Sequence, residues 1–157
     1  MLGDLDFAVA NQWEASFLYR NDRFDAAAAR AGDARDFLGL RLLLPVGQGA
    51  GGAVRIDSAA GELRGRPAIG ASVRVVRSDG RILVGQVDGG SGHSGVRSPE
   101  LHFGLGDSAA EAVEVLIRYR DRNGNAQSLE LLLDPGWHSV LLPDGGTSVA
   151  LAQRGAR

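Results

Sequence analysis

Apolar and polar residues alternate in short runs from residue 37 onward, and glycine-rich turns separate the runs. In AVEVLIRY (112–119) every second residue from Val113 to Tyr119 is apolar, whereas Glu114 and Arg118 lie between them. A period of two is typical of a strand with one buried face. The Asn123-Gly124 pair that follows predicts a hairpin leading into a second strand.

The segment ASVRVVRSDGRILVGQV (71–87) predicts another hairpin. Its Asp79-Gly80 pair suits a two-residue type I′ turn, in which both central residues adopt positive φ. A loop of that length fixes which side chains share a face. We assign the following four to the core: Val73, Val75, Ile82 and Val84.

Further strands are predicted on either side of these hairpins. FLGLRLLLPV (37–46) is expected to end near Pro45, because proline cannot donate to a sheet. WHSVLLP (137–143) and TSVALA (147–152) are predicted as closing strands, joined by the turn at 144–146. Short strands at this spacing are typical of a sandwich or a barrel.

One segment favours a helix, FDAAAARAGDARD (24–36), in which Asp25 could cap one or two turns and Gly32 could end them. The composition changes there from an aromatic, asparagine-containing stretch to the β-rich remainder. We therefore predict a boundary, with one unit at 1–30 and a second at 36–157.

Composition narrows the range of functions. The net charge of −2 argues against a nucleic-acid partner, which would favour a basic excess. All 17 basic residues are arginine and there is no cysteine, which excludes lysine Schiff bases, disulfides and thiol chemistry. The 23 glycines predict many turns. No apolar run is long enough for a membrane span, and no signal peptide is visible.

Two glycine-containing motifs lack the context that their chemistry needs. GQGAGG (47–52) fits the dinucleotide pattern G-x-G-x-x-G, but the sequence after it alternates where a helix is required. GHSGV (92–96) begins like the serine-hydrolase elbow G-x-S-x-G, but its second glycine falls one position early. Neither motif therefore predicts catalysis, and no catalytic residue is assigned.

Histidines and arginines supply the remaining candidates. His93, His102 and His138 match no common metal spacing, although dispersed ligands such as these and Asp107 can converge in space. His102 lies in ELHFGLG (100–106) and alternates like a strand residue. Arginines at 118, 120 and 122 form a basic stripe, which can bind phosphate, but the acidic surroundings favour a solvated strand edge.

The chain opens with Gly3-Asp4-Leu5-Asp6, which is similar to the end of a calcium loop. If Gly3 is aligned with the glycine of such a loop, Asp6 is the closing carboxylate and the backbone carbonyl of Asp4 is a calcium ligand. The earlier acidic positions of such a loop are missing. We interpret Asp4 and Asp6 as the remnant of an incomplete calcium loop, and expect no calcium bound by this chain itself.

Residues 3–22, GDLDFAVANQWEASFLYRND, resemble the end of an FG-GAP (VCBS-type) propeller repeat, with strands like DFAVAN (6–11) and SFLYRN (16–21). FLGLRL (37–42), IGASVRVV (69–76) and the segment at 89–119 resemble the ASPIC/UnbV domain. The resemblance departs from the family where YRDRNGN (119–125) replaces a Trp-Pro-Ser-Gly-like turn. It implies an all-β fold, an antiparallel β-sandwich preceded by a β-hairpin left over from a propeller blade.

The resemblance also implies a function. The chain would be the C-terminal part of a longer secreted or cell-surface protein, extracellular or periplasmic, whose intact propeller binds calcium. Its role would be non-catalytic protein–protein or glycan binding, and the exposed segment 1–30 would favour self-association. The alternative is an accessory role in enediyne-type natural-product biosynthesis. The residues suspected of ligand binding under that alternative are His93, Ser94 and His102.

Overall fold

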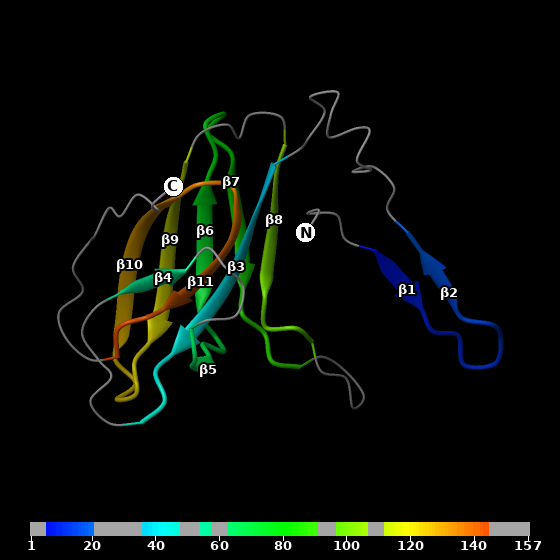
Figure 1. The fold of residues 1–157 in the computed structure, drawn as a ribbon, viewed down its shortest axis with the longest axis horizontal. Helices are drawn as coiled ribbons and strands as arrows, with labels where there is room; N and C mark the ends of the chain where they lie inside the picture. The colour runs from blue at the N-terminus through cyan, green and yellow to red at the C-terminus, as the bar shows by residue number, and fades with distance from the viewer. Residues whose placement is uncertain are drawn as a thin grey trace.

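The computed structural model describes residues 6–20, 36–47, 54–57, 63–90, 97–106 and 112–144, and all regular structure within them is β-strand. The strands are β1 (Phe7–Val9), β2 (Phe17–Tyr19), β3 (Asp36–Leu44), β4 (Arg55–Asp57), β5 (Arg66–Pro67), β6 (Ser72–Val76), β7 (Ile82–Gln86), β8 (Leu101–Gly106), β9 (Val113–Arg120), β10 (Ala126–Leu133) and β11 (Gly136–Leu141). They form a two-stranded sheet β1-β2, a four-stranded sheet β10-β9-β6-β7, and a five-stranded sheet β4-β11-β3-β5 in which β8 also pairs with β3 (Figure 1).

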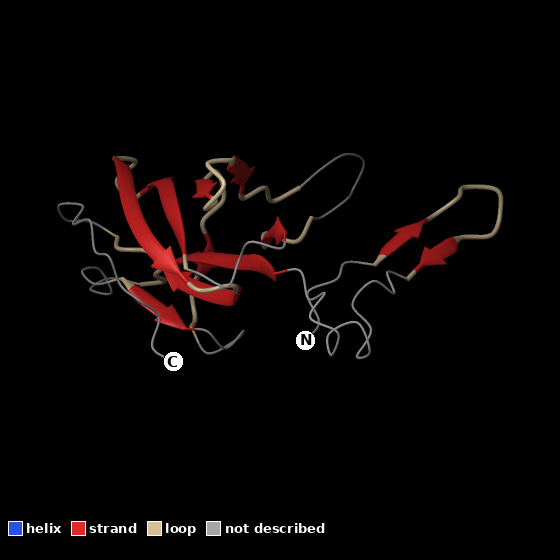
Figure 2. Ribbon diagram, turned by 90° about the horizontal axis from the view of Figure 1, so that it is seen from above, coloured by secondary structure: helices blue, strands red, loops and turns tan. Residues whose placement is uncertain are grey.

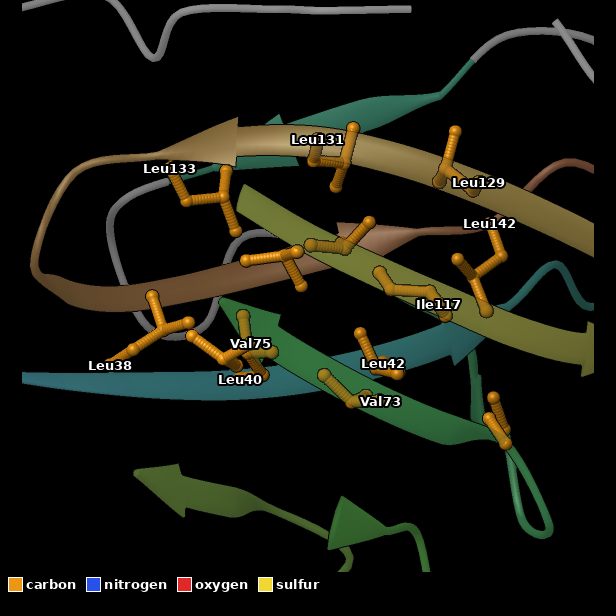
Figure 3. Close-up of a cluster of buried hydrophobic side chains, with 14 of the residues drawn as sticks. Leu38, Leu40, Leu42, Val73, Val75, Ile117, Leu129, Leu131, Leu133 and Leu142 are labelled. Carbon is orange, nitrogen blue, oxygen red and sulfur yellow. The ribbon is translucent and has the colours of Figure 1, made fainter. Parts of the chain in front are cut away.

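The two larger sheets enclose the main hydrophobic core. Alternate residues of β3, among them Leu38, Leu40 and Leu42, point toward the four-stranded sheet (Figure 3). That sheet contributes Val73 and Ile117, both fully buried. Strands in both sheets bury every second residue between the sheets, as is typical of a sandwich. The predicted all-β sandwich is therefore confirmed. Figure 2 shows the same strands from above.

Strand β3 lies inside its sheet and ends at Leu44, immediately before Pro45, as predicted. It pairs antiparallel with β8 and β5. Its pair with β11 is parallel, with Leu38 opposite Gly136 and Leu43 opposite Leu141. The other recorded pairs of the described strands are antiparallel.

The hairpin β9–β10 follows the predicted alternation, since Val113, Val115, Ile117 and Tyr119 are all buried. Its loop contains three residues, because Asp121 N–H donates to the Asn125 carbonyl at 3.0 Å. Gly124, the last loop residue, has φ of 82°. A type I turn followed by a left-handed glycine is a common three-residue hairpin.

The hairpin β6–β7 uses the same kind of loop, and this corrects one prediction. Val76 pairs with Ile82 and Val75 with Leu83, so the connection is one residue longer than a two-residue turn. Gly80 has φ of 81° at its end. A shift of one residue reverses every side chain of the second strand. Ile82 and Val84 therefore face outward, 47% and 70% exposed, and the prediction that they are buried is wrong.

The two N-terminal strands that the sequence predicts form β1 and β2, paired with Phe7 opposite Tyr19. The rings of these two residues stack at 4.5 Å. The predicted helical turns at 25–32 and the strand at 147–152 lie outside the described residues. Nothing in the described part of the chain forms a helix with the length and apolar character that crossing a membrane requires.

Candidate functional site

The outward face of the five-stranded sheet carries three aromatic rings close together. Gly39 of β3 pairs with His102 of β8 on one side and with Trp137 of β11 on the other. Phe37 lies two residues before Gly39 and so shares its face. Leu38 points the opposite way, into the core. We call Phe37, His102 and Trp137 the aromatic cluster; each side chain is partly buried.

The rings of the aromatic cluster contact one another in two geometries. Phe37 and His102 are stacked, with centroids 4.8 Å apart and planes 9° from parallel. Phe37 meets Trp137 edge-on at 5.9 Å and 68°, and His102 lies 6.0 Å from Trp137. Two rings in a stacked or edge-to-face arrangement attract each other, and this adds to the stabilisation from burying their apolar surface. The cluster is therefore a packed surface with a defined orientation for each ring.

Gly39 makes room for the Trp137 side chain. A Cβ built on Gly39 would lie 2.3 Å from Cε3 of the indole and 2.4 Å from Cδ2. Any residue other than glycine would push the ring away, because that separation is far below a van der Waals contact. Gly39 thus determines how closely the indole lies on the sheet.

Polar residues continue the same face beyond the aromatic cluster. Ser139 of β11 pairs with Arg41 of β3 on one side and with Asp57 of β4 on the other. Ser139 is buried, whereas Arg41 and Asp57 are partly buried. The face thus combines a tryptophan with an arginine, the residue types that most often carry binding energy at interfaces.

A second polar group lies at the loop of the β9–β10 hairpin. The Asp121 carboxylate accepts hydrogen bonds from the backbone N–H groups of Asn123 and Asn125, both at 2.9 Å, and from the side chains of Asn125 and Gln127. Burial acts to raise the pKa of Asp121, but these hydrogen bonds outweigh it, and the pKa is lowered from 3.8. The Asp121 carboxylate therefore stabilises the loop of the β9–β10 hairpin.

Tyr119 and Asp144 tie this loop to the segment after β11. The Tyr119 hydroxyl donates to the Pro143 carbonyl at 2.9 Å. Its burial, helped by the charges of Asp121 and Asp144, raises the pKa of Tyr119 to about 12. Arg122 donates to Asp144 through its backbone N–H at 2.6 Å and through Nε at 2.5 Å. We interpret this group as structural.

The structure separates His102 and His138, the two described histidines among the metal ligands that the sequence offered. His102 lies on the outward face of the sheet, whereas His138 pairs with Leu40 and is buried on the inner face. His138 Nε2–H donates to the Asp134 carbonyl at 2.7 Å, which is a structural role. Within the described ranges, no three acidic, histidine or cysteine residues are placed to hold a metal ion.

Of the predicted site residues, His102 belongs to the aromatic cluster and Asp6 is exposed beside β1. Asp4, His93 and Ser94 lie outside the described residues. Sequence reasoning missed Phe37 and Trp137 as partners of His102. A signal for them existed in Gly39, which interrupts a run of leucines in a strand where a side chain is otherwise favoured.

Comparisons with known proteins locate the chain in one family. No curated protein and no solved structure matches it. The family model described as "ASPIC and UnbV" matches residues 61–148, more than half of the chain. The match includes His102 and Trp137 but begins after Phe37 and Gly39, so the aromatic cluster extends beyond it. The chain belongs to the ASPIC and UnbV family.

Proposed function

We propose that this chain is a non-catalytic interaction module that binds a glycan or a protein through the aromatic cluster. The observation that carries the proposal is the packing of Phe37, His102 and Trp137 into one oriented surface on an outward sheet face. Rigid aromatic rings lose little side-chain entropy on binding and offer large contact areas. Membership of the ASPIC and UnbV family is consistent with such a module.

The neighbouring Arg41 supports a binding role for the same face. It is partly buried and pairs with Ser139, which lies two residues after Trp137 on β11. Arginine and tryptophan are over-represented among residues whose removal weakens binding most. A ligand that extends from the rings along β3 would also meet this arginine, which favours partners with carbonyl, hydroxyl or carboxylate oxygens.

Glycan binding is tested by the fluorescence of Trp137. The chain has two tryptophans, so the variant Trp13→Phe leaves Trp137 as the only reporter. Titration with cellohexaose and with chitohexaose is expected to change the Trp137 emission in a saturable way. His102→Ala removes one ring of the cluster without touching the indole, and should weaken that response.

Protein binding is tested by photo-cross-linking. Phe37→p-benzoylphenylalanine places the reactive group in the aromatic cluster, and Val84→p-benzoylphenylalanine places it on the other sheet, where the side chain is exposed. A cross-link from position 37 and none from position 84 supports a protein partner at this face. Absence of both a glycan response and a position-37 cross-link would refute the proposal.

The wider setting that we propose is a secreted or cell-surface FG-GAP-repeat protein, whose calcium is bound by the propeller. Its support is the likeness of residues 3–22 to a repeat, together with the β1–β2 hairpin. A blot of source cells with antibodies against residues 36–143 tests it. A band much larger than 16.4 kDa is expected, and a band at 16.4 kDa would contradict it.

A further inference from the structure

Two arginines of β9 line a cleft on the outward face of the four-stranded sheet. The cleft has a volume of about 300 Å³, and its walls come from Ile69, Gly70, Ser72, Arg118, Tyr119, Arg120 and Ala126. It lies on a different sheet from the aromatic cluster. No acidic residue is among its lining side chains. The cleft is therefore cationic within a chain whose net charge is −2.

Strand geometry places the two charges side by side. Arg118 and Arg120 are two residues apart on one strand, so they share a face and their Cα atoms are about 7 Å apart. An anion bound between them would interact favourably with both charges. The third arginine of the predicted stripe, Arg122, is committed to Asp144. Of the three arginines in the stripe, only Arg118 and Arg120 are therefore available to a ligand.

The two guanidinium groups differ in how firmly they are held. Arg120 donates from Nη1 to the Gly124 carbonyl at 2.7 Å, which holds its planar group beside the β9–β10 loop. The Arg118 side chain makes no ion pair or hydrogen bond with another residue in the described part of the chain. Ser72, directly opposite Arg118 in the register, adds a hydroxyl donor. One fixed cation, one unpaired cation and one hydroxyl thus face the same space.

We propose that this cleft binds a phosphate or sulfate group carried on a small organic molecule. Arginine forks match the oxygens of such anions in two parallel hydrogen bonds. The cleft is larger than an oxyanion alone needs, so part of the molecule that carries the oxyanion can also enter it. Ile69, which is 56% exposed, offers an apolar wall for the rest of the ligand. A local anion site is compatible with the absence of a general basic excess.

The test is calorimetric titration of the full chain at low ionic strength with glucose 6-phosphate and glucose 6-sulfate. Uncharged glucose is the control ligand. Saturable binding of at least one ester is expected, and the tighter of the two identifies the preferred oxyanion. Arg118→Gln should weaken binding about tenfold, the usual cost of losing one charge-assisted hydrogen-bond partner. Binding should also decline with added sodium chloride, because salt screens exposed charges.

Two further variants keep the test specific. Arg74→Gln removes the same charge from the same sheet face, but Arg74 does not line the cleft. The Arg74→Gln variant should therefore bind the esters as tightly as the unaltered chain does. Ala126→Glu places a carboxylate directly opposite Arg120 and should abolish binding with both arginines intact. The proposal is overturned if neither ester binds, if Arg74→Gln weakens binding as much as Arg118→Gln, or if Ala126→Glu has no effect.

Discussion

The indole ring of Trp137 lies against the backbone of Gly39, where a Cβ would come within 2.3 Å of ring carbon Cε3. The two residues are paired across parallel strands that are far apart in the sequence. The orientation of the aromatic cluster therefore depends on the pairing of β3 with β11. The stability of the sheet and the orientation of the rings are therefore coupled through one glycine.

Gly39→Ala is expected to destabilise the chain by about 1–3 kcal/mol, because the added methyl displaces a packed ring. Urea unfolding followed by circular dichroism measures the change. Gly104→Ala is the matched control, since Gly104 lies opposite Phe37 on the adjacent strand and a Cβ there meets nothing within 4 Å. Equal effects of the two substitutions would contradict the role of Gly39.

The register of the β6–β7 hairpin predicts opposite outcomes for the same substitution on its two strands. Val75→Thr buries a hydroxyl in the core and should cost about 1–3 kcal/mol. Val84→Thr exposes the same group to water and should change stability by less than about 0.5 kcal/mol. Unfolding curves of both variants measure the difference. A loss at position 84 as large as at position 75 would show that the register is wrong.

Tyr119 makes stability depend on pH in the alkaline range. Its pKa is raised from 10.0 to about 12 in the folded chain, so the unfolded chain loses the proton first. This contribution to stability is fully present below pH 10, and the free energy of unfolding should fall as the pH rises from 10 to 12.

Tyr119→Phe removes this ionisation and should flatten that part of the stability profile. It should also cost about 1 kcal/mol at neutral pH through loss of the hydrogen bond to Pro143. Tyr19→Phe, at a tyrosine that is 49% exposed, is the control. An unchanged alkaline slope in Tyr119→Phe would assign the slope to other groups.

The β1–β2 hairpin predicts self-association of the chain. Phe7, Val9, Phe17 and Tyr19 share one of its faces, and each is at least 38% exposed. An isolated two-stranded sheet is marginally stable in water, so covering this face is favourable. Light scattering at high concentration should show a mass above the monomer, which Phe7→Ser combined with Phe17→Ser lowers. Ala8→Ser, on the opposite face, should leave the mass unchanged; a monomer in every case would contradict the prediction.

Local sequence patterns predicted the strands whose neighbours are close along the chain. The alternation from Val113 to Tyr119 is sufficient to predict strand β9 and its buried face, because one buried face imposes a period of two. The same reasoning failed at Ile82 and Val84, where a three-residue loop replaced the two-residue turn that Asp79-Gly80 suggested. Both hairpin loops contain three residues and end in a glycine at positive φ, and an Asp-Gly or Asn-Gly pair alone does not distinguish such a loop from a two-residue turn.

The candidate site was less accessible to sequence reasoning. His102 was singled out as a strand residue, but its partners Phe37 and Trp137 come from strands at opposite ends of the domain. Their proximity depends on which strands pair and in which direction, and a local period carries no such information. The parallel β3–β11 pair was for that reason not predicted.

That parallel pair also determines when the domain can be completed during synthesis. Strand β3 leaves the ribosome near the start of the sandwich, and β11 near its end, with the other seven described strands of the two large sheets made between them. Strand β3 cannot pair with β11 until nearly the whole sandwich has been synthesised, and pairings between strands so far apart in the sequence form slowly. The nascent sandwich therefore passes through a stage in which a strongly apolar strand lacks one neighbour, and chaperone contact is most useful at that stage.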